Sequence, residues 1–315
     1  MTTQPPTQPP TQPPTQPPTA QLLRPTARPR WRWWIKLRRN PVGMLGAILV
    51  ALALLVAVGA PVLAPREPTK QNLRSRMMPP AWYAEGDVTF FLGTDQLGRD
   101  LLSRLIYGAR ISVVVGVLGV LVAMVVGVAL GLISGYAGGW VDTIVSRIVD
   151  TFMSIPFILL AMAVVGALGL GKGSGLLTLV IVLGLTGWVT FARVVRGEVL
   201  SIKERDFVQS ARSIGQTDLW ILLRHILPNV MASIIVLSTL QIATVIIAES
   251  SLSFLGLGVQ PPTITWGVML AEGRDHLATS WWLATFPGLA ISLTVLGAIL
   301  FGDWLRDVLD PRMKL

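Results

Sequence analysis

A glycine-rich heptapeptide is the segment whose spacing comes nearest to a nucleotide-binding site. Residues 166–172, Gly-Ala-Leu-Gly-Leu-Gly-Lys, match G-x-x-x-x-G-K, the start of a phosphate-binding loop. The complete motif continues with Ser or Thr and joins a strand to a helix, whereas Gly173 follows here and both flanks are long and apolar. We therefore expect a glycine-rich turn between two membrane helices, on the outer face, and no ATP site.

The other side chains that could do chemistry are a few carboxylates and two histidines. Cysteine is absent, which excludes disulfides and thiolate metal sites. His225 and His276 are expected on opposite sides of the membrane, where each is predicted to be an interfacial polar residue. Asp150, Glu249 and Asp303 lie only at the edges of apolar stretches, whereas an ion-coupled carrier would usually need acids near mid-membrane. The sequence therefore predicts no metal site and no catalytic residue, and the energy for any transport must come from another protein.

The elements that position these residues are predicted to be membrane helices. The 315 residues are 52% hydrophobic and 14% charged, with a mean hydropathy of +0.63; soluble domains carry about 25% charged residues. A bilayer crossing needs about 20 apolar residues. Pro156 predicts a kink or a late start in the third candidate, and a short turn makes the third and fourth antiparallel neighbours. The six stretches free of Asp, Glu, Lys and Arg are Val42–Ala64, Ile111–Tyr136, Thr151–Gly171, Gly173–Ala192, Ile226–Ala248 and Trp281–Gly302.

The basic residues predict how the chain is oriented. Of the 26 Lys and Arg residues, 17 share one side of the membrane if the N-terminus is cytoplasmic. We expect both termini inside, with the first apolar stretch kept as an anchor rather than cleaved as a signal peptide. Residues 3–18 are four copies of Thr-Gln-Pro-Pro, which favour polyproline II and cannot build a core. The expected organisation is a disordered tail (1–23), a basic cytoplasmic segment (24–41), and a six-helix membrane domain (42–315) with a cytoplasmic loop at 193–229.

The first half of that cytoplasmic loop is predicted to form a short helix. Phe207–Ile214 is a helix-favouring run, and Glu204 and Asp206 lie near its start, where the helix dipole favours acids. Gly215 can adopt the positive φ of a residue that ends a helix. The small side chains of this run would allow another protein to approach closely.

The second half of the loop is predicted to be a second helix. Asp218 can cap Leu219–Leu223, and Pro228 then leads into the fifth apolar stretch. On residue pattern alone a cytoplasmic helical loop of this kind has two interpretations. One is an ordinary surface loop, and the other is a docking site for a second protein.

The loop resembles the EAA signature of ABC-importer permeases, which is Glu-Ala-Ala, three residues, Gly, nine residues, Ile, one residue, Leu-Pro. The matching positions are Gln209, Ser210, Ala211, Gly215, His225, Leu227 and Pro228. Gln209, Ser210 and His225 depart from the consensus, and Gln209 removes the charge that the family's Glu carries. The runs 211–215 and 224–229 are similar to the dipeptide/oligopeptide/nickel subfamily.

Three further stretches are similar to the C-type subunit of that subfamily. They are Leu92–Ser112 before the second apolar stretch, Glu249–Pro262 with Trp266 and Gly267 after the fifth, and Gly302–Arg312 at the chain end. The resemblance covers about residues 30–315 and leaves out the Thr-Gln-Pro-Pro tail.

Two of these outer segments contain candidate functional residues. The charged residues of the first are either a solvated amphipathic helix on the membrane, with Asp100 and Arg104 as an i,i+4 pair, or a collar that touches a partner. Ser250–Gly258 is either a re-entrant segment that lines the pathway or a surface packed on the partner subunit. The candidates for an outer collar or gate are Asp95, Arg99, Asp100, Arg104, Glu249, Ser250, Phe254 and Gly256.

The resemblance implies an all-α, six-helix protein with the type I ABC-importer permease fold. It implies a non-catalytic pore subunit of a binding-protein-dependent importer, for di- or oligopeptides, in a prokaryotic inner or plasma membrane. The implied partners are a B-type permease, two ATPase subunits that hold ATP and magnesium, and an external binding protein; nucleic acid is not among them. The alternatives are the same machinery importing nickel or another small solute, and a stand-alone secondary transporter or channel. The expected ATPase-docking residues are Gln209, Ser210, Ala211, Arg212, Gly215, Asp218, Leu227 and Pro228.

Overall fold

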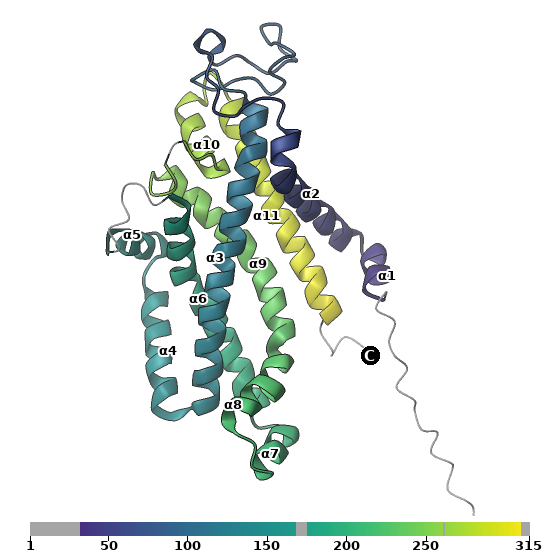
Figure 1. The fold of residues 1–315 in the computed structure, drawn as a ribbon, viewed down its shortest axis with the longest axis vertical. Helices are drawn as coiled ribbons and strands as arrows, with labels where there is room; N and C mark the ends of the chain where they lie inside the picture. Colours follow the sequence, from purple (N-terminus) through teal and green to yellow (C-terminus); the bar gives the residue numbers. More distant parts are fainter. Residues whose placement is uncertain (1–31, 168–174, 261, 310–315) are drawn as a thin grey trace, which may run out of the picture.

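The computed structural model describes residues 32–167, 175–260 and 262–309 (Figure 1). In this part of the chain the regular elements are helices, and the only β-type pairing is an isolated bridge between Thr94 and Asp100. The expected all-α fold is therefore confirmed. The helices are α1 (Arg32–Arg39), α2 (Pro41–Leu63), η1 (Leu73–Ser75), α3 (Leu101–Ala137), α4 (Gly139–Ser154), α5 (Phe157–Ala167), α6 (Gly175–Ile202), α7 (Asp206–Ser213), α8 (Asp218–Ile221), η2 (Leu222–Ile226), α9 (Leu227–Phe254), α10 (Trp266–Gly273), η3 (Arg274–His276) and α11 (Trp282–Leu309).

Five of these helices are long and apolar enough to cross a membrane, and a bent pair makes a sixth crossing if it is counted as one. The five are α2, α3, α6, α11 and the continuous helix from Asp218 to Phe254. The bent pair is α4 and α5, which meet at 106°. The predicted break at Pro156 is confirmed, but the helix before it begins at Gly139 rather than at Thr151. The glycine-rich turn that was expected to follow lies mostly outside the described residues.

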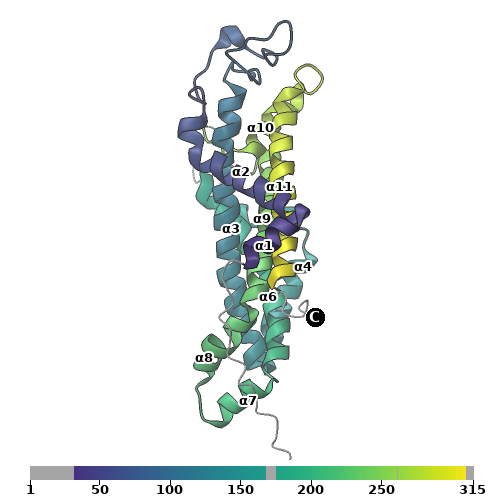
Figure 2. The same cartoon turned by 90° about the vertical axis from the view of Figure 1, so that its right-hand side faces the viewer.

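The helix α3 is much longer than the membrane requires. It begins ten residues before the predicted stretch, because the Asp100 side chain accepts a hydrogen bond from the Ser103 backbone amide (2.8 Å) and caps it. Its 37 residues span about 55 Å, against about 30 Å of hydrocarbon. In Figures 1 and 2 its far end lies beside α7 and α8, at the opposite end of the molecule from the loops that precede it. The first ten residues of α3, which include Arg104 and Arg110, therefore extend beyond the membrane thickness.

The contact between α3 and α6 is the most extensive in the protein. Gly127, Gly131 and Gly135 lie four residues apart, so they form one stripe along α3. A Cβ added at Gly127 would lie 2.3 Å from the Trp188 carbonyl oxygen, and one at Gly131 would lie 2.8 Å from the Ala192 carbonyl oxygen. The stripe thus lets the two backbones touch, as small residues do in membrane helix pairs.

The helix that follows α7 contains a π-helical turn. Leu222–Ile226 forms this turn, and the Leu227 amide donates to the Leu222 carbonyl oxygen five residues earlier. Pro228 lacks the amide hydrogen that would continue the regular pattern, which is a common cause of a local change in helical register. The chain nevertheless stays helical from Asp218 through Phe254.

The first membrane helix packs on the last one. The side chain of Asn40 accepts a hydrogen bond from the Gly43 amide (2.9 Å) and fixes the start of α2. From there α2 crosses α11, and the contact between them is second only to that of α3 with α6 (Figure 2). The start of α2 and the end of α11 both point toward the end of the molecule that carries α7 and α8 (Figure 1).

Candidate docking site and outer polar clusters

The loop that resembles the permease signature forms the two predicted helices, α7 and α8. Asp206 occupies the first turn of α7, as expected from the helix dipole. Gly215 has a φ of +77°, and the Gln216 amide donates to the Ala211 carbonyl oxygen (3.2 Å). This is the geometry of a helix that ends at a glycine, so the predicted role of Gly215 is confirmed.

One face of the loop is buried against the membrane helices. Val208, Ala211, Ile221 and Ile226 are buried, and they pack with Leu132 of α3 and with apolar residues of α6 and α9. The Gln209 side-chain amide donates to the Lys203 carbonyl oxygen at the end of α6 (3.2 Å). The loop is therefore part of the folded core at this end of the molecule.

A polar contact ties the loop to the end of α3. The Tyr136 hydroxyl donates to the Asp218 carboxylate (2.6 Å), and the Arg212 guanidinium lies 5.6 Å from the centre of the Tyr136 ring. The neighbouring Tyr136 hydroxyl, and more weakly the Asp218 and Glu204 carboxylates, raise the pKa of Arg212, so this cation stays charged. The expected cap by Asp218 is wrong: Thr217 holds the cap position of α8, and the Asp218 carboxylate instead accepts a hydrogen bond from Tyr136 of α3.

We expect Tyr136→Phe to loosen α7 and α8 without unfolding the protein. The substitution keeps the ring under Arg212 but removes the hydrogen bond to Asp218, whose loss is worth about 1 kcal/mol. Backbone hydrogen exchange at 206–221 should become several-fold faster, while exchange in α2 and α11 stays unchanged. Tyr107→Phe, on the same helix but distant from the loop, serves as the control. Equal exchange rates in wild type and Tyr136→Phe would show that this contact does not hold the loop.

The opposite face of the loop exposes large apolar side chains. Ile214 is 75% exposed, Leu219 66% and Trp220 55%, and Phe207 and Leu223 are also exposed. Such an exposed apolar patch is typical of a protein interaction site. None of these five residues was among the predicted docking residues. Their alternation with buried Val208, Ala211 and Ile221 could have identified them.

The remaining signature positions are distributed around this patch. Ser210, Arg212, Asp218 and Pro228 are exposed, whereas Leu227 is half-buried. His225 takes the place of the family's Ile, and its Nε2 is 2.9 Å from the side-chain oxygen of Gln216. The structure thus brings all the expected docking residues to one end of the molecule, with Ala211 buried beneath the others.

The first outer charge cluster is buried, which corrects the expectation of a solvated amphipathic helix. Asp95 and Arg104 are 1% and 2% exposed. Arg104 forms ion pairs with Asp95 and with Glu272 (2.7 Å to the latter), and Arg99 binds Asp95 (2.5 Å) and Glu272 (3.2 Å). Residues 92–100 form turns rather than a helix, and Asp100 caps α3 instead of pairing with Arg104. The cluster joins the outer loop to α10.

The second outer cluster surrounds Glu249, which is fully buried near the outer end of α9. Its carboxylate accepts from the Ser253 hydroxyl (2.8 Å) and lies 3.4–3.5 Å from those of Ser250 and Ser112. The Ser112 hydroxyl accepts from the Trp266 amide (3.2 Å), so the cluster links α3, α9 and α10.

Of the two interpretations of Ser250–Gly258, the re-entrant segment is not what the structure shows, because most of the segment continues α9. Ser250 and Phe254 belong to the last turns of α9, and the Arg274 guanidinium lies 5.2 Å from the centre of the Phe254 ring. Gly256 follows in the turn with a φ of +79°. Within α9 the hydroxyls of Ser250 and Ser251 donate to carbonyl oxygens one turn earlier, which satisfies both hydroxyls.

Neither cluster has the composition of a metal site, and over the described ranges no three His, Asp or Glu side chains converge. Most of the glycine-lysine segment at 166–172 lies outside the described residues.

The family can be established by comparison. Residues 127–315 match the family described as binding-protein-dependent transport system inner membrane component. The chain belongs to this family. Residues 29–80 of the permease match the N-terminal TM domain of oligopeptide transport permease C, which agrees with the expected C-type subfamily. The permease is therefore a multi-pass inner membrane protein of the ABC transporter class.

Relatives cover nearly the whole permease. The di/tripeptide transport system permease protein DppC of Pseudomonas aeruginosa (strain UCBPP-PA14) is 39% identical over 286 residues, covering 91% of this chain and 93% of that protein. The glutathione transport system permease protein GsiD of Shigella flexneri serotype 5b (strain 8401) is 45% identical over 290 residues, covering 91% of each.

A solved structure shares the fold of the permease. The inward-facing MetNI methionine ABC transporter matches with a TM-score of 0.55 and 19% identity, covering 66% of this chain and 96% of that chain. At this identity the match concerns the fold alone, and it confirms the type I importer architecture expected from the sequence.

Proposed function

We propose that this chain is the C-type permease subunit of an ATP-driven importer of di- or tripeptides. The observation that carries the proposal is the exposed apolar patch on α7 and α8, on the loop that resembles the ATPase-docking signature. The relative named for di/tripeptide transport supports the substrate class. The chain itself supplies no catalytic residue, and ATP and magnesium bind to the partner ATPases.

The mechanism is alternating access driven from the docking loop. The ATPase subunits bind Ser210, Arg212, Gly215, Asp218 and the apolar patch, while Gln209, Ala211, Leu227 and Pro228 shape the loop beneath. Closure of the ATPase pair displaces α7 and α8, and the displacement passes into α9 because the helix continues unbroken from Asp218. A ligand shifts a two-state equilibrium only through its different affinity for the two states. Here the docking loop supplies that difference.

The partners follow from this arrangement. The permease pairs with a B-type permease, two ATPase subunits bind from the cytoplasm, and a binding protein delivers substrate to the outer loops. Both termini are cytoplasmic, which agrees with the excess of Lys and Arg on that side. The two outer clusters, Asp95–Arg99–Arg104–Glu272 and Glu249 with its serines, hold the outer loops in the shape that meets the binding protein, with Asp100, Phe254 and Gly256 at their edges.

A second candidate substrate is a thiol tripeptide of the glutathione type. It is favoured by the relative named for glutathione transport, which is 45% identical over 290 residues. Nickel is less favoured, because the described residues gather no metal-ligand group. Selection of the metal would then depend on the external binding protein alone. Competition of unlabelled glutathione against labelled dipeptide in an uptake assay separates the two peptide classes.

We expect Gly215→Arg to detach the permease from its ATPases. A non-glycine residue at a φ of +77° costs about 1–2 kcal/mol, and the new side chain projects into the docking surface. Co-purification from membranes that express the whole operon should fall at least tenfold, and ATP-dependent uptake of labelled dialanine into proteoliposomes should fall with it.

The matched control is Gly256→Arg, compared for ATPase retention alone. Gly256 has a similar φ of +79° and an equally open surrounding, but it lies at the outer end of α9. It should retain the ATPases as wild type does. If both variants retain them, the docking site is wrongly placed. If wild-type complex takes up peptide under an ion gradient without any ATPase, the importer proposal is wrong.

A further inference from the structure

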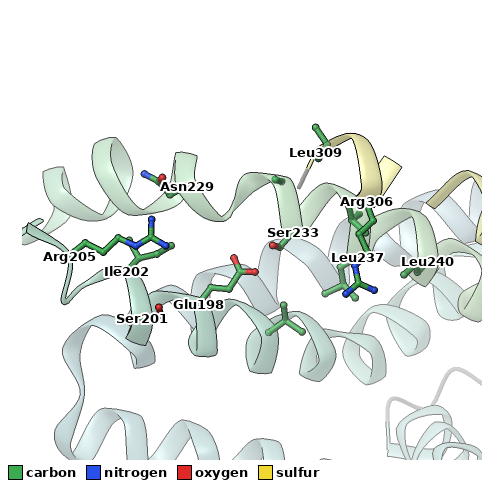
Figure 3. A pocket seen from close by; sticks show the side chains of 13 residues that line it. Glu198, Ser201, Ile202, Arg205, Asn229, Ser233, Leu237, Leu240, Arg306 and Leu309 are labelled. Carbon is green, nitrogen blue, oxygen red and sulfur yellow. The ribbon is translucent and has the colours of Figure 1, made fainter. Parts of the chain in front are cut away.

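A groove opens between α6, α9 and α11, and one end of it reaches the start of α7 (Figure 3). Its volume is about 630 Å³, within the range of about 300–1,000 Å³ that small-molecule sites occupy. Apolar side chains of α9 form part of the wall, and polar side chains from all three helices form the rest. The lining residues are Val194, Glu198, Ser201, Ile202, Arg205, Asn229, Ala232, Ser233, Val236, Leu237, Leu240, Arg306 and Leu309.

Three charged side chains line this groove, and within the described part of the chain none of them forms an ion pair. They are the half-buried Glu198 and the exposed Arg205 and Arg306. The neighbouring Arg196 of α6, by contrast, is paired with Asp142. A half-buried carboxylate without a cation is costly unless a ligand or water satisfies it. The groove therefore presents one anion and two cations for which the protein supplies no partner.

The charges are spaced along the groove. In Figure 3, Glu198 lies between Arg205 at one end and Arg306 toward the other. Glu198 lies in the last turns of α6, and Arg205 lies three residues beyond its end. A short peptide carries the complementary pair of charges, an ammonium at one end and a carboxylate at the other. The order of the carboxylate and the guanidinium along the groove thus suits a zwitterionic peptide that lies along it.

Uncharged polar groups of the facing helix also line the groove. Asn229 and Ser233 of α9 line the same groove, four residues apart and so on one face of the helix. Amide and hydroxyl groups at this position can bond to peptide N–H and C=O groups. Val236 and Leu237, further along α9, offer apolar surface to a side chain.

We propose that this groove is a cytoplasmic exit site for a zwitterionic tripeptide. Its N-terminal ammonium binds Glu198, its C-terminal carboxylate binds Arg205, and its backbone bonds to Asn229 and Ser233. This inference rests on the proposed import of peptides and adds a binding site on this subunit to it. Because Arg205 also precedes the first residue of α7, the exit site adjoins the docking loop.

The test is equilibrium binding of radiolabelled trialanine to the ATP-free importer complex in nanodiscs, without binding protein. Wild type should bind trialanine saturably, and Glu198→Gln should weaken binding about tenfold, the effect of removing one charged hydrogen bond. N-acetyl-trialanine, which lacks the ammonium, should bind wild type and Glu198→Gln equally. Arg205→Gln should in the same way remove the preference for trialanine over its C-terminal amide.

The control substitutions are Asp307→Asn and Arg306→Gln. Asp307 is exposed on α11 next to Arg306 but does not line the groove, so its variant should bind trialanine as wild type does. If Arg306→Gln, rather than Arg205→Gln, abolishes the preference for a free carboxylate, the assigned orientation is wrong. Co-purification with the partner subunits verifies that each variant is folded.

Two outcomes separate the exit site from the proposed function. If the wild-type complex takes up trialanine with ATP and binding protein, yet binds none in nanodiscs, or if Glu198→Gln binds it unchanged, the exit site is wrong and the importer stands. If no peptide is taken up under any condition, the proposed function itself fails.

Discussion

Gly127→Ala is expected to destabilise the permease by about 3 kcal/mol, although it adds only one methyl group. The new Cβ would lie 2.3 Å from the Trp188 carbonyl oxygen, 2.5 Å from the Phe191 Cβ and 3.0 Å from the Ala192 amide nitrogen. Two of these atoms belong to the α6 backbone, so a rotamer change cannot relieve the overlap. Overpacking of a tight contact costs about 1–3 kcal/mol, and backbone overlap lies at the upper end. Thermal melting of the purified complex, followed by size exclusion, should show a clear drop.

The matched control for this prediction is Gly197→Ala on α6. A Cβ at Gly197 meets nothing within 4 Å, so the same methyl group should be harmless. It should even stabilise the helix, since alanine is about 1 kcal/mol better than glycine in a helix interior. Equal melting temperatures for the two variants would mean that α3 and α6 are not in backbone contact. Gly127→Leu extends the series and should abolish accumulation of the permease in the membrane.

The second large effect is expected at the buried outer charges. Arg104→Met leaves the carboxylates of Asp95 and Glu272 with Arg99 as their only cation in the described structure. Removing one partner from a buried ion-pair network costs about 3–5 kcal/mol, because the remaining charges stay desolvated. Hydrogen exchange in the outer loop and the melting temperature should both report the loss.

A double-mutant cycle tests whether the effect arises from the ion pairs. Adding Glu272→Gln to Arg104→Met should recover part of the stability, since one uncompensated carboxylate is removed. Arg110→Met is the matched control: Arg110 is exposed on the same helix, and its change should alter stability by less than about 0.5 kcal/mol. A similar loss in both arginine variants would show that burial of Arg104 does not matter.

Local sequence signals predicted the helices and the shape of the docking loop. Runs without charge located the spanning helices, Pro156 predicted the break between α4 and α5, and Gly215 predicted the end of α7. Each of these depends on groups within one or two helical turns. The boundaries were less accurate, because α3 and α6 continue into polar segments that a bilayer-length criterion does not include.

Contacts between distant residues could not be predicted in the same way. Arg99 and Glu272 are 173 positions apart, and only the fold reveals that the outer charges are buried together. Tyr136 and Asp218 are 82 apart, which is why a cap was predicted where a bond to α3 forms. The groove near Glu198 depends on three helices that are separate in sequence. Pairing of this kind needs the packing of whole helices.

The unbroken helix from Asp218 to Phe254 has a mechanical consequence. Its 37 residues span about 55 Å, with the exposed apolar patch of α7 and α8 near one end and the Glu249 serine cluster near the other. A rigid helix moves as one body. A displacement of α8 is therefore carried to the other end of the helix unless the helix bends in between. The π-helical turn at Leu222–Ile226 is the one irregular turn of this helix within the described structure. Substitutions that stiffen or loosen this turn would therefore change how much of a displacement at α8 reaches Glu249.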